Sequence, residues 1–183
     1  MRCLVPLALF VLLLNSLHAA GMREELLAGV EKIAAPGAPG PLCLVGDQAF
    51  AVVCGESNKG LQQAVVAAAE YGKGRIVLFG HTGYFDTDSL NKADTGKLLL
   101  NSARWSGRKQ AARVGVIKSN GLREYLAKNG VSATALDPKN WTENLKEIDT
   151  LCLSPDVLAN DAARAALDAF VKNGGGVISA SLG

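Results

Sequence analysis

The chain has 183 residues, of which 49% are hydrophobic, 20% are charged and 5% are aromatic. This composition is typical of an ordinary globular domain and excludes a disordered chain. The net charge is only +2, and no run of five basic residues occurs. The sequence therefore lacks the concentrated positive charge that is typical of nucleic-acid-binding proteins.

The N-terminus has the pattern of a cleaved secretory signal. Arg2 supplies a positive charge, residues 3–14 form an apolar run, and small residues permit cleavage after Ala19 or, beyond Gly21, before Met22. A membrane anchor is the alternative, but the run is shorter than the roughly 20 apolar residues that span a bilayer. We therefore expect a secreted chain, or a periplasmic one in a bacterium, with no stable membrane insertion after cleavage.

The first part of the mature chain predicts a helix, a linker and a hairpin. Residues 22–34 carry apolar side chains at helical spacing and run into a Pro/Gly linker that ends at residue 41. Residues 42–45 and 50–54 predict two strands of a hairpin. The alanine-rich residues 61–71 then predict a helix.

From residue 75 onward, short apolar strands alternate with helices. The strands are expected at 75–80, 112–117, 132–136, 150–154 and 176–180, and the helices at 95–105, 121–129, 141–146 and 159–172. This alternation indicates a parallel sheet with helices on both faces. We predict a flavodoxin-like, doubly wound three-layer sandwich with an N-terminal β-hairpin.

The predicted organisation has three parts: a signal peptide over 1–21, a helix and linker over 22–41, and an α/β domain over 42–183. The last predicted strand is a central one, and no helix follows it. We therefore expect an incomplete domain whose sheet is partly uncovered, so that it associates with a partner or aggregates.

Three cysteines follow the predicted signal. Cys43 and Cys54 lie symmetrically about a turn on one face of the predicted hairpin, and in an oxidising compartment they can form a disulfide. The alternative is a pair of buried thiols, as is expected for Cys152 within an apolar strand. The absence of a C-x-x-C motif or Cys/His cluster from the sequence argues against a zinc site, and no metal or cofactor is expected.

Three polar motifs can each be interpreted in two ways, as a functional site or as an ordinary structural feature. Residues 55–60 have the span of a phosphate loop, but the lysine that such a loop needs is missing, which favours a turn. Asp86 and Asp88 could hold a cation, but acidic residues ahead of a helix more often act as caps, and we expect caps. Asn140 begins an N-glycosylation sequon, which has meaning if the source is eukaryotic.

Two candidate catalytic residues follow predicted strands. His81 comes directly after one, where ligands gather in open α/β sheets and where a histidine can act as a general base. Its alternative is a histidine hydrogen-bonded within a loop. Ser181 follows the final strand, where a sharp turn could present a nucleophile. Its alternative is simply the end of a core strand, because a serine also needs a base and an orienting acid.

Several stretches of the chain resemble a known family. Residues 42–53, 63–81 and 98–105 are similar to the N-terminal region of the TRP-channel-associated factor family, and to a region of secreted proteins with an enhancin-type zinc peptidase domain. The resemblance implies a domain similar to class I glutamine amidotransferases, whose nucleophilic cysteine lies in a pattern that residues 177–183 match. Ser181 stands at the position of that cysteine.

A hydroxyl attacks an amide far less readily than a thiolate, so the resemblance implies a degenerate, non-catalytic domain. We expect it to serve as a recognition or scaffold module, with a protein or glycan partner, at the N-terminal end of a longer protein. The alternative is a secreted hydrolase with Ser181 as nucleophile, or an accessory region of an enhancin-type metallopeptidase. The peptidase motif H-E-x-x-H is absent from this sequence.

Overall fold

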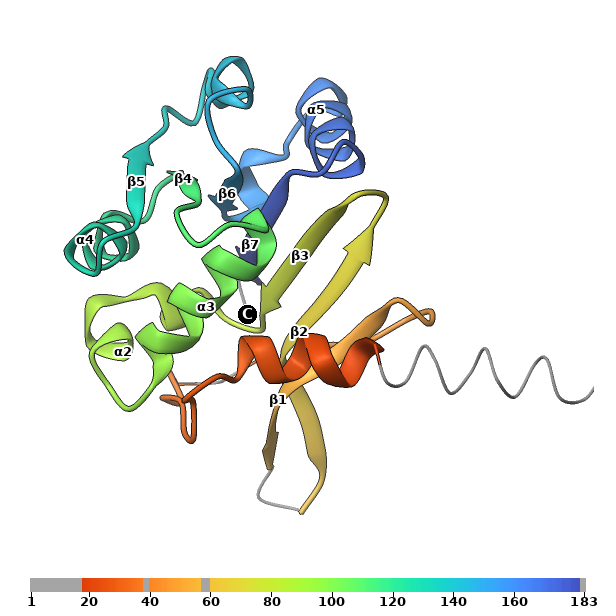
Figure 1. The fold of residues 1–183 in the computed structure, drawn as a ribbon, viewed down its shortest axis with the longest axis vertical. Coiled ribbons are helices and arrows are strands. Elements are labelled where there is room, and N and C mark those ends of the chain that lie inside the picture. The colour runs from red at the N-terminus through yellow and green to blue at the C-terminus, as the bar shows by residue number, and fades with distance from the viewer. Residues whose placement is uncertain (1–17, 38–39, 57–59, 182–183) are drawn as a thin grey trace, which may run out of the picture.

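The computed structural model describes residues 18–37, 40–56 and 60–181, so most of the predicted signal peptide lies outside the described residues. Within them, seven strands form one sheet in the order β1-β2-β3-β7-β6-β4-β5 (Figure 1). The strands are β1 (Ala49–Glu56), β2 (Gln62–Tyr71), β3 (Gly74–Phe79), β4 (Arg113–Val116), β5 (Ser132–Ala135), β6 (Thr150–Leu153) and β7 (Gly176–Ala180).

The strands β3, β7, β6, β4 and β5 are parallel to their neighbours, whereas β1 and β2 extend the sheet with antiparallel pairing. The prediction of an α/β fold with a mostly parallel sheet is therefore confirmed. Consecutive strands change direction across the sheet after β5, because β5 lies on one side of β4 while β6 and β7 lie on the other.

Helices cover both faces of this sheet. They are α2 (Thr87–Leu90), α3 (Thr95–Gly107), α4 (Asn120–Lys128) and α5 (Asp161–Lys172), with the short 3₁₀ helices η1 (Thr82–Phe85), η2 (Trp141–Asn144) and η3 (Pro155–Val157). Residues on β6 and β7 alternate between two hydrophobic clusters. One cluster contains Cys152 and Ile178 with side chains of α3 and α4, and the other contains Leu151 and Val177 with side chains of α5. Two separate cores on opposite faces follow from this alternation.

The alanine-rich segment 61–71 forms the strand β2, so the prediction of a helix there is wrong. This strand pairs with β1 on one side and with β3 on the other, and Val65 to Ala68 are all buried. Alanine favours helices in isolation, but pairing on both edges outweighs that preference.

The predicted hairpin between residues 42–45 and 50–54 is also wrong. Residues 42–45 are not in a strand, and the hairpin that forms joins β1 to β2. Leu42 keeps one sheet-like contact, since its N–H donates to the carbonyl oxygen of Ala64 over 2.8 Å. Gly55 and Glu56, where the phosphate-loop pattern begins, belong to β1, and the next element is the strand β2 rather than the helix that a phosphate loop needs.

The N-terminal helix covers residues 18–26 and ends earlier than predicted. Met22 and Leu26 are buried in the core beside β1. Gly29 adopts a φ of 66°, which a glycine tolerates and which is incompatible with a continuing helix. The chain that follows is held by α3, because Lys97 Nζ donates to the Gly29 carbonyl oxygen.

The expectation of an uncovered central strand is wrong. All five residues of β7 are buried, because α3 packs on one face and α5 on the other. Among the described residues, the exposed large hydrophobic side chains are instead Leu44, Val45, Leu61 and Tyr71, and none belongs to β7.

Candidate functional site

The structure brings the two predicted catalytic residues to the same edge of the sheet. Phe79 at the end of β3 lies beside Ala180 at the end of β7, and the strands are parallel. The N–H of Ser181 donates to the carbonyl oxygen of Phe79 over 2.9 Å. His81 and Ser181 therefore follow adjacent strands at their carboxyl ends, which is where α/β sheets bind ligands.

The side chain of His81 is committed to its own loop. Its Nδ1 accepts a hydrogen bond from the N–H of Gly83 over 2.9 Å, and this bond caps η1. When Nδ1 accepts, the neutral imidazole carries its proton on Nε2. Neither nitrogen of this tautomer is then available to act as a general base.

A crevice of about 280 Å³, lined by both apolar and polar side chains, lies at the carboxyl ends of β4 and β6. Its wall includes Lys118 and Ser119, which follow β4, Ser154 and Asp156, which follow β6, and Asp86 from the turn before α2. These are the two strands between which the direction of the chain connections reverses, and such a reversal opens a gap for ligands in open α/β sheets.

Two of the charges in this crevice are already paired with each other. Lys118 Nζ donates to Asp156 Oδ2, and this hydrogen bond lowers the pKa of Asp156, so the two residues neutralise each other. Behind them, burial raises the pKa of the Cys152 thiol to about 12. A thiol with that pKa is not a nucleophile at neutral pH. The crevice offers hydroxyl groups and an ion pair for binding, but its described residues provide no activated nucleophile.

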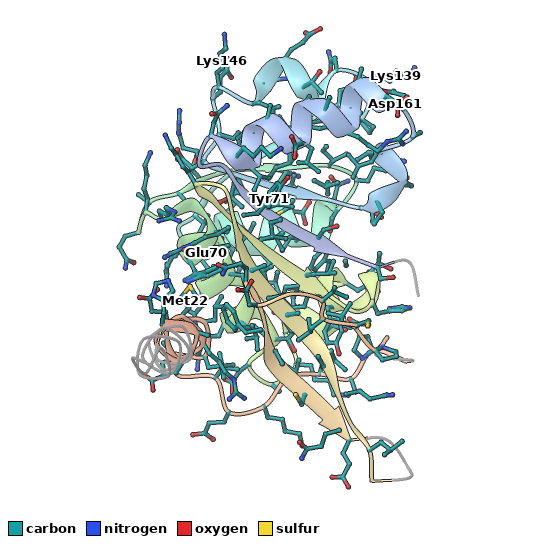
Figure 2. The ribbon with its side chains drawn as sticks, turned by 90° about the vertical axis from the view of Figure 1, so that its right-hand side faces the viewer. Met22, Glu70, Tyr71, Lys139, Lys146 and Asp161 are labelled. Atoms are coloured by element: carbon teal, nitrogen blue, oxygen red, sulfur yellow. The ribbon has the colours of Figure 1, made fainter. Side chains whose placement is uncertain are left out.

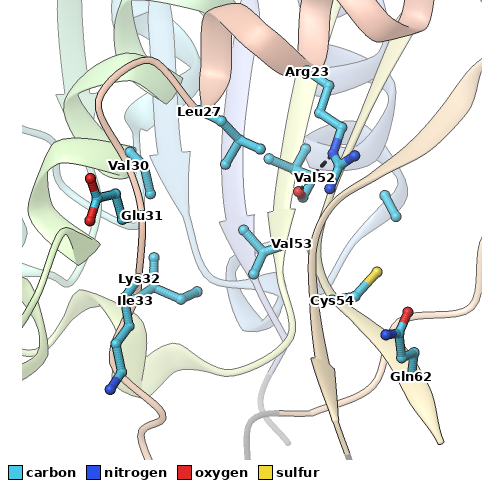
Figure 3. A pocket seen from close by; sticks show the side chains of 11 residues that line it. Arg23, Leu27, Val30, Glu31, Lys32, Ile33, Val52, Val53, Cys54 and Gln62 are labelled. Atoms are coloured by element: carbon cyan, nitrogen blue, oxygen red, sulfur yellow. Dashed lines mark hydrogen bonds between the residues drawn. The ribbon is translucent and has the colours of Figure 1, made fainter.

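A second depression, of about 520 Å³, runs along the edge strand β1 (Figure 3). Leu27 and Ile33 line one side of it and Cys54 the other. Figure 3 shows Arg23 reaching toward the strand, where its Nε donates to the Val52 carbonyl oxygen over 3.2 Å. A charged side chain over an edge strand hinders the addition of another strand, so this edge is partly protected.

A third cleft, of about 670 Å³, lies at the C-terminal end of α3 and was not found by sequence reasoning. Arg75 from β3 lines it together with Arg104, Trp105, Arg108 and Lys109 from α3 and the turn after it. Arg104 lies in the last turn of α3 and Arg108 is its C-cap residue with a φ of 54°, so their spacing of four residues suggests a basic helix face that the structure does not form. The contribution of the β3 arginine has no such signal.

The two cysteines of the predicted disulfide, Cys43 and Cys54, are both exposed and are free thiols in the structure. Cys54 lies opposite Ala64 of β2, and Leu42, the neighbour of Cys43, donates its N–H to the carbonyl oxygen of Ala64.

The remaining predicted residues lie on the surface. Asp86 occupies the N-cap position of α2, but its side chain makes no capping hydrogen bond, so the expected side-chain cap does not form. Asp88 lies exposed in the first turn of the same helix. Asn140 is exposed at the start of η2, and its glycosylation stays a prediction.

The described residues contain neither a candidate metal site nor a candidate membrane-spanning helix. Residues 18–37, 40–56 and 60–181 contain no group of three or more His, Cys, Asp or Glu side chains that could hold a metal ion. Within those same ranges, no helix has the length and apolar character needed to cross a membrane.

These features define a mixed α/β domain with a crevice where its strand connections reverse. Comparison with known proteins gives the family. The model of the TCAF N-terminal family, described as "TRPM8, N-terminal domain", matches residues 8–181. The chain therefore belongs to this family, as its resemblance to TRP-channel-associated factors predicted.

The curated relatives are much longer than this chain. It is 35% identical over 162 residues to TRPM8 channel-associated factor 2 of Bos taurus, covering 87% of this chain and 16% of that protein. The Homo sapiens factor 2 is 33% identical over 162 residues, with the same coverage of 87% and 16%. The Xenopus laevis homolog is 31% identical over 166 residues, covering 86% and 16%. The chain thus spans about a sixth of the length of these relatives.

Solved structures with the same fold come from a peptidase. The IMPa metallopeptidase from Pseudomonas aeruginosa superimposes with a TM-score of 0.67 at 14% sequence identity, covering 94% of this chain and 21% of that one. Its complex with T-antigen gives a TM-score of 0.68 at 14% identity, with the same coverage. At this level of identity the likeness concerns the fold alone.

Proposed function

We propose that this chain is a non-catalytic, amidotransferase-like recognition module that acts as the N-terminal part of a longer exported protein. The proposal rests on the residues found at the position of the amidotransferase nucleophile. Ser181 stands where the amidotransferase pattern has cysteine, and the imidazole of His81, which follows the neighbouring strand, has its Nδ1 bonded to Gly83. A serine hydroxyl is a weaker nucleophile than a cysteine thiolate.

The topology supports the amidotransferase-like part of the proposal. Within the parallel half of the sheet, the order β5-β4-β6-β7 corresponds to the 2-1-3-4 order of flavodoxin-like folds. That fold keeps a ligand crevice even where no chemistry occurs. The exported location rests on the N-terminal signal pattern alone.

A protein partner fits this domain best. The relatives are named as channel-associated factors, and the chain aligns with their sequence over 85% or more of its length. We infer that the domain contributes to protein recognition in the same way, with its partner still to be identified.

A second candidate function is favoured by the solved structures. Because 94% of this chain superimposes on 21% of the IMPa metallopeptidase, the domain is also compatible with an accessory region of a metallopeptidase. The zinc motif would then lie elsewhere in the protein, since His18 and His81, the histidines of the sequence, are not part of an H-E-x-x-H motif.

The proposal is tested with a fluorophosphonate probe for activated serines. We expect no labelling of the purified chain and no hydrolysis of glutamine. Ser181→Ala is compared with Ser132→Ala, which changes an exposed serine on β5. Labelling that persists in Ser132→Ala and disappears in Ser181→Ala would show that the serine is activated and would refute the non-catalytic function.

A further inference from the structure

The cleft at the C-terminal end of α3 concentrates positive charge. Four cationic side chains line it, and the carboxylate among its lining residues is Glu25. The cationic residues are Arg75, Arg104, Arg108 and Lys109. The whole chain carries a net charge of only +2, so this local excess of cations is a feature of the cleft rather than of the protein.

Part of this charge is neutralised from outside the cleft. Glu70 accepts hydrogen bonds from Arg75 Nε at 3.0 Å and from Arg108 Nη2 at 3.1 Å. Lys109 Nζ donates to Asp149 Oδ1 at 2.8 Å. These pairs hold the cationic groups in place, but each guanidinium still has N–H groups that can donate to a ligand.

Two further donors belong to residues that line the cleft and have no partner within the described residues. The guanidinium of Arg104 makes no hydrogen bond or ion pair with any described residue. Trp105 is 4% exposed, and its indole N–H has no acceptor within the described residues. Arg104 can therefore donate to a ligand, while the indole N–H of Trp105 is a buried, unsatisfied donor in the wall.

The cleft also has a rigid wall. The guanidinium of Arg75 stacks over the ring of Trp105, with 4.7 Å between its central carbon and the ring centroid, and its Nη1 donates to the Trp105 carbonyl oxygen. Only 16% of the Arg75 side chain is exposed. Asn101 closes another side by donating to the carbonyl oxygens of Leu26 and Ala28. Arg75 is therefore positioned before a ligand arrives, whereas the guanidinium of Arg104 has no bond to a described residue that fixes it.

The chemistry of these donors favours carboxylates. Three of the four cations are arginines, whose planar guanidinium groups bind carboxylates with two parallel hydrogen bonds. The absence of a long basic stretch in the sequence argues against a polyanion such as nucleic acid. A cleft of about 670 Å³ accommodates several residues of a peptide.

We propose that this cleft binds an acidic peptide segment of a partner protein, with Arg104 and Arg108 as its main contacts to the carboxylates. This inference rests on the proposed function as a recognition module and names the chemistry of its partner. The basic cleft lies beside α3 and β3, away from the crevice at the carboxyl ends of β4 and β6, so both can be tested separately.

The test uses a short fluorescein-labelled peptide of alternating Glu and Ser residues and the purified full chain. Binding is measured by fluorescence anisotropy at low salt and at about 1 M NaCl, where the Debye length is about 3 Å. A peptide with Gln in place of Glu serves as the uncharged control. We expect binding of the acidic peptide that is lost in high salt, and little binding of the Gln peptide.

Arg104→Gln is the informative variant, because removal of a guanidinium without partners leaves no group of the fold unpaired. We expect it to weaken peptide binding by about tenfold or more. Lys139→Gln is the matched control, since it removes one exposed positive charge from another part of the molecule. Figure 2 shows Lys139 far from Glu70, which marks the position of the basic cleft. The thermal melting of both variants should match that of the natural chain.

Three results would overturn the inference. They are equal binding of the Glu and Gln peptides, equal affinities of the Arg104→Gln and Lys139→Gln variants, and binding of a sulfated oligosaccharide in place of the peptide. The serine probe is applied to the same samples. Labelling of Ser181 would refute the proposed function, whereas failure of peptide binding without labelling would refute only the acidic-peptide cleft.

Discussion

Replacement of Asp149 by alanine should destabilise the fold more than any change to an exposed ion pair. The carboxylate is only 11% exposed and accepts four hydrogen bonds, from Lys109 Nζ and from the Nε, Nη2 and main-chain N–H of Arg113. Its own main chain bonds to Arg113 of β4 and Gly176 of β7. Asp149 therefore joins three strands at their amino ends.

The magnitude follows from these contacts. Lys109 and Arg113 are 59% and 51% exposed, so each ion pair contributes at most about 1 kcal/mol. The bond from the Arg113 main-chain N–H to a charged, mostly buried acceptor contributes about 1.5 to 3 kcal/mol. We therefore expect Asp149→Ala to lower the free energy of unfolding by about 3 kcal/mol.

Urea unfolding followed by tryptophan fluorescence measures this loss, because Trp105 and Trp141 are both buried. With a urea m-value of about 2 kcal/mol/M, the midpoint should fall by about 1.5 M. Asp161→Ala is the control: its carboxylate is 98% exposed and pairs with Arg164, so its removal should cost less than about 1 kcal/mol. Equal midpoints for the two variants would refute the reasoning.

The same carboxylate predicts a dependence on pH. Hydrogen bonds from Arg113, and further ones from Lys109, hold the pKa of Asp149 in the folded chain well below its ordinary value. The unfolded chain, with an ordinary aspartate pKa of about 3.9, binds the proton first as the pH falls. The stabilisation is therefore complete above about pH 5 and is lost in more acidic solution. The difference between the natural chain and Asp149→Ala should shrink from pH 5 toward pH 2.

Two further predictions concern packing and thiol chemistry. In Gly176→Ala the new Cβ would lie 2.5 Å from the main chain of α3. We therefore expect the free energy of unfolding, measured by heat or urea, to fall by about 2 kcal/mol or more. Gly21→Ala, with nothing within 4 Å of its Cβ, is the control and should be nearly neutral. Iodoacetamide at pH 8 should modify the exposed Cys43 and Cys54 in the native protein but reach the buried Cys152 only after unfolding. Mass spectrometry that finds rapid modification of all three would contradict the burial.

The parallel half of the sheet could be predicted because each of its strands is recognisable from its own residues. Each is a short apolar run between helices, and burial on both faces requires that pattern. The antiparallel half could not. Residues 62–71 contain four alanines, which predict a helix locally, and only the pairing with β1 and β3 makes them a strand.

For the candidate site, the sequence predicts at which edge of the sheet the residues lie, but it does not predict which hydrogen bonds they make. His81 and Ser181 could be placed after strands, and parallel strands end at one edge. The hydrogen bond from Gly83 to the imidazole, which removes the base, depends on loop geometry that no residue pattern reveals. The basic cleft was missed because Arg75 and Trp105 are 30 residues apart in the sequence and meet only when α3 packs on β3.

The central place of β7 has a consequence for how the protein folds. The meander β1–β2–β3 is built from contacts between neighbouring segments, which form quickly. In contrast, β7 comes last in the chain and lies between β3 and β6, joining Arg75 to Gly176 across about a hundred residues. During synthesis, the meander and the β4–β5–β6 unit therefore lack the strand that pairs with both of them until residues 176–180 leave the ribosome and complete the sheet.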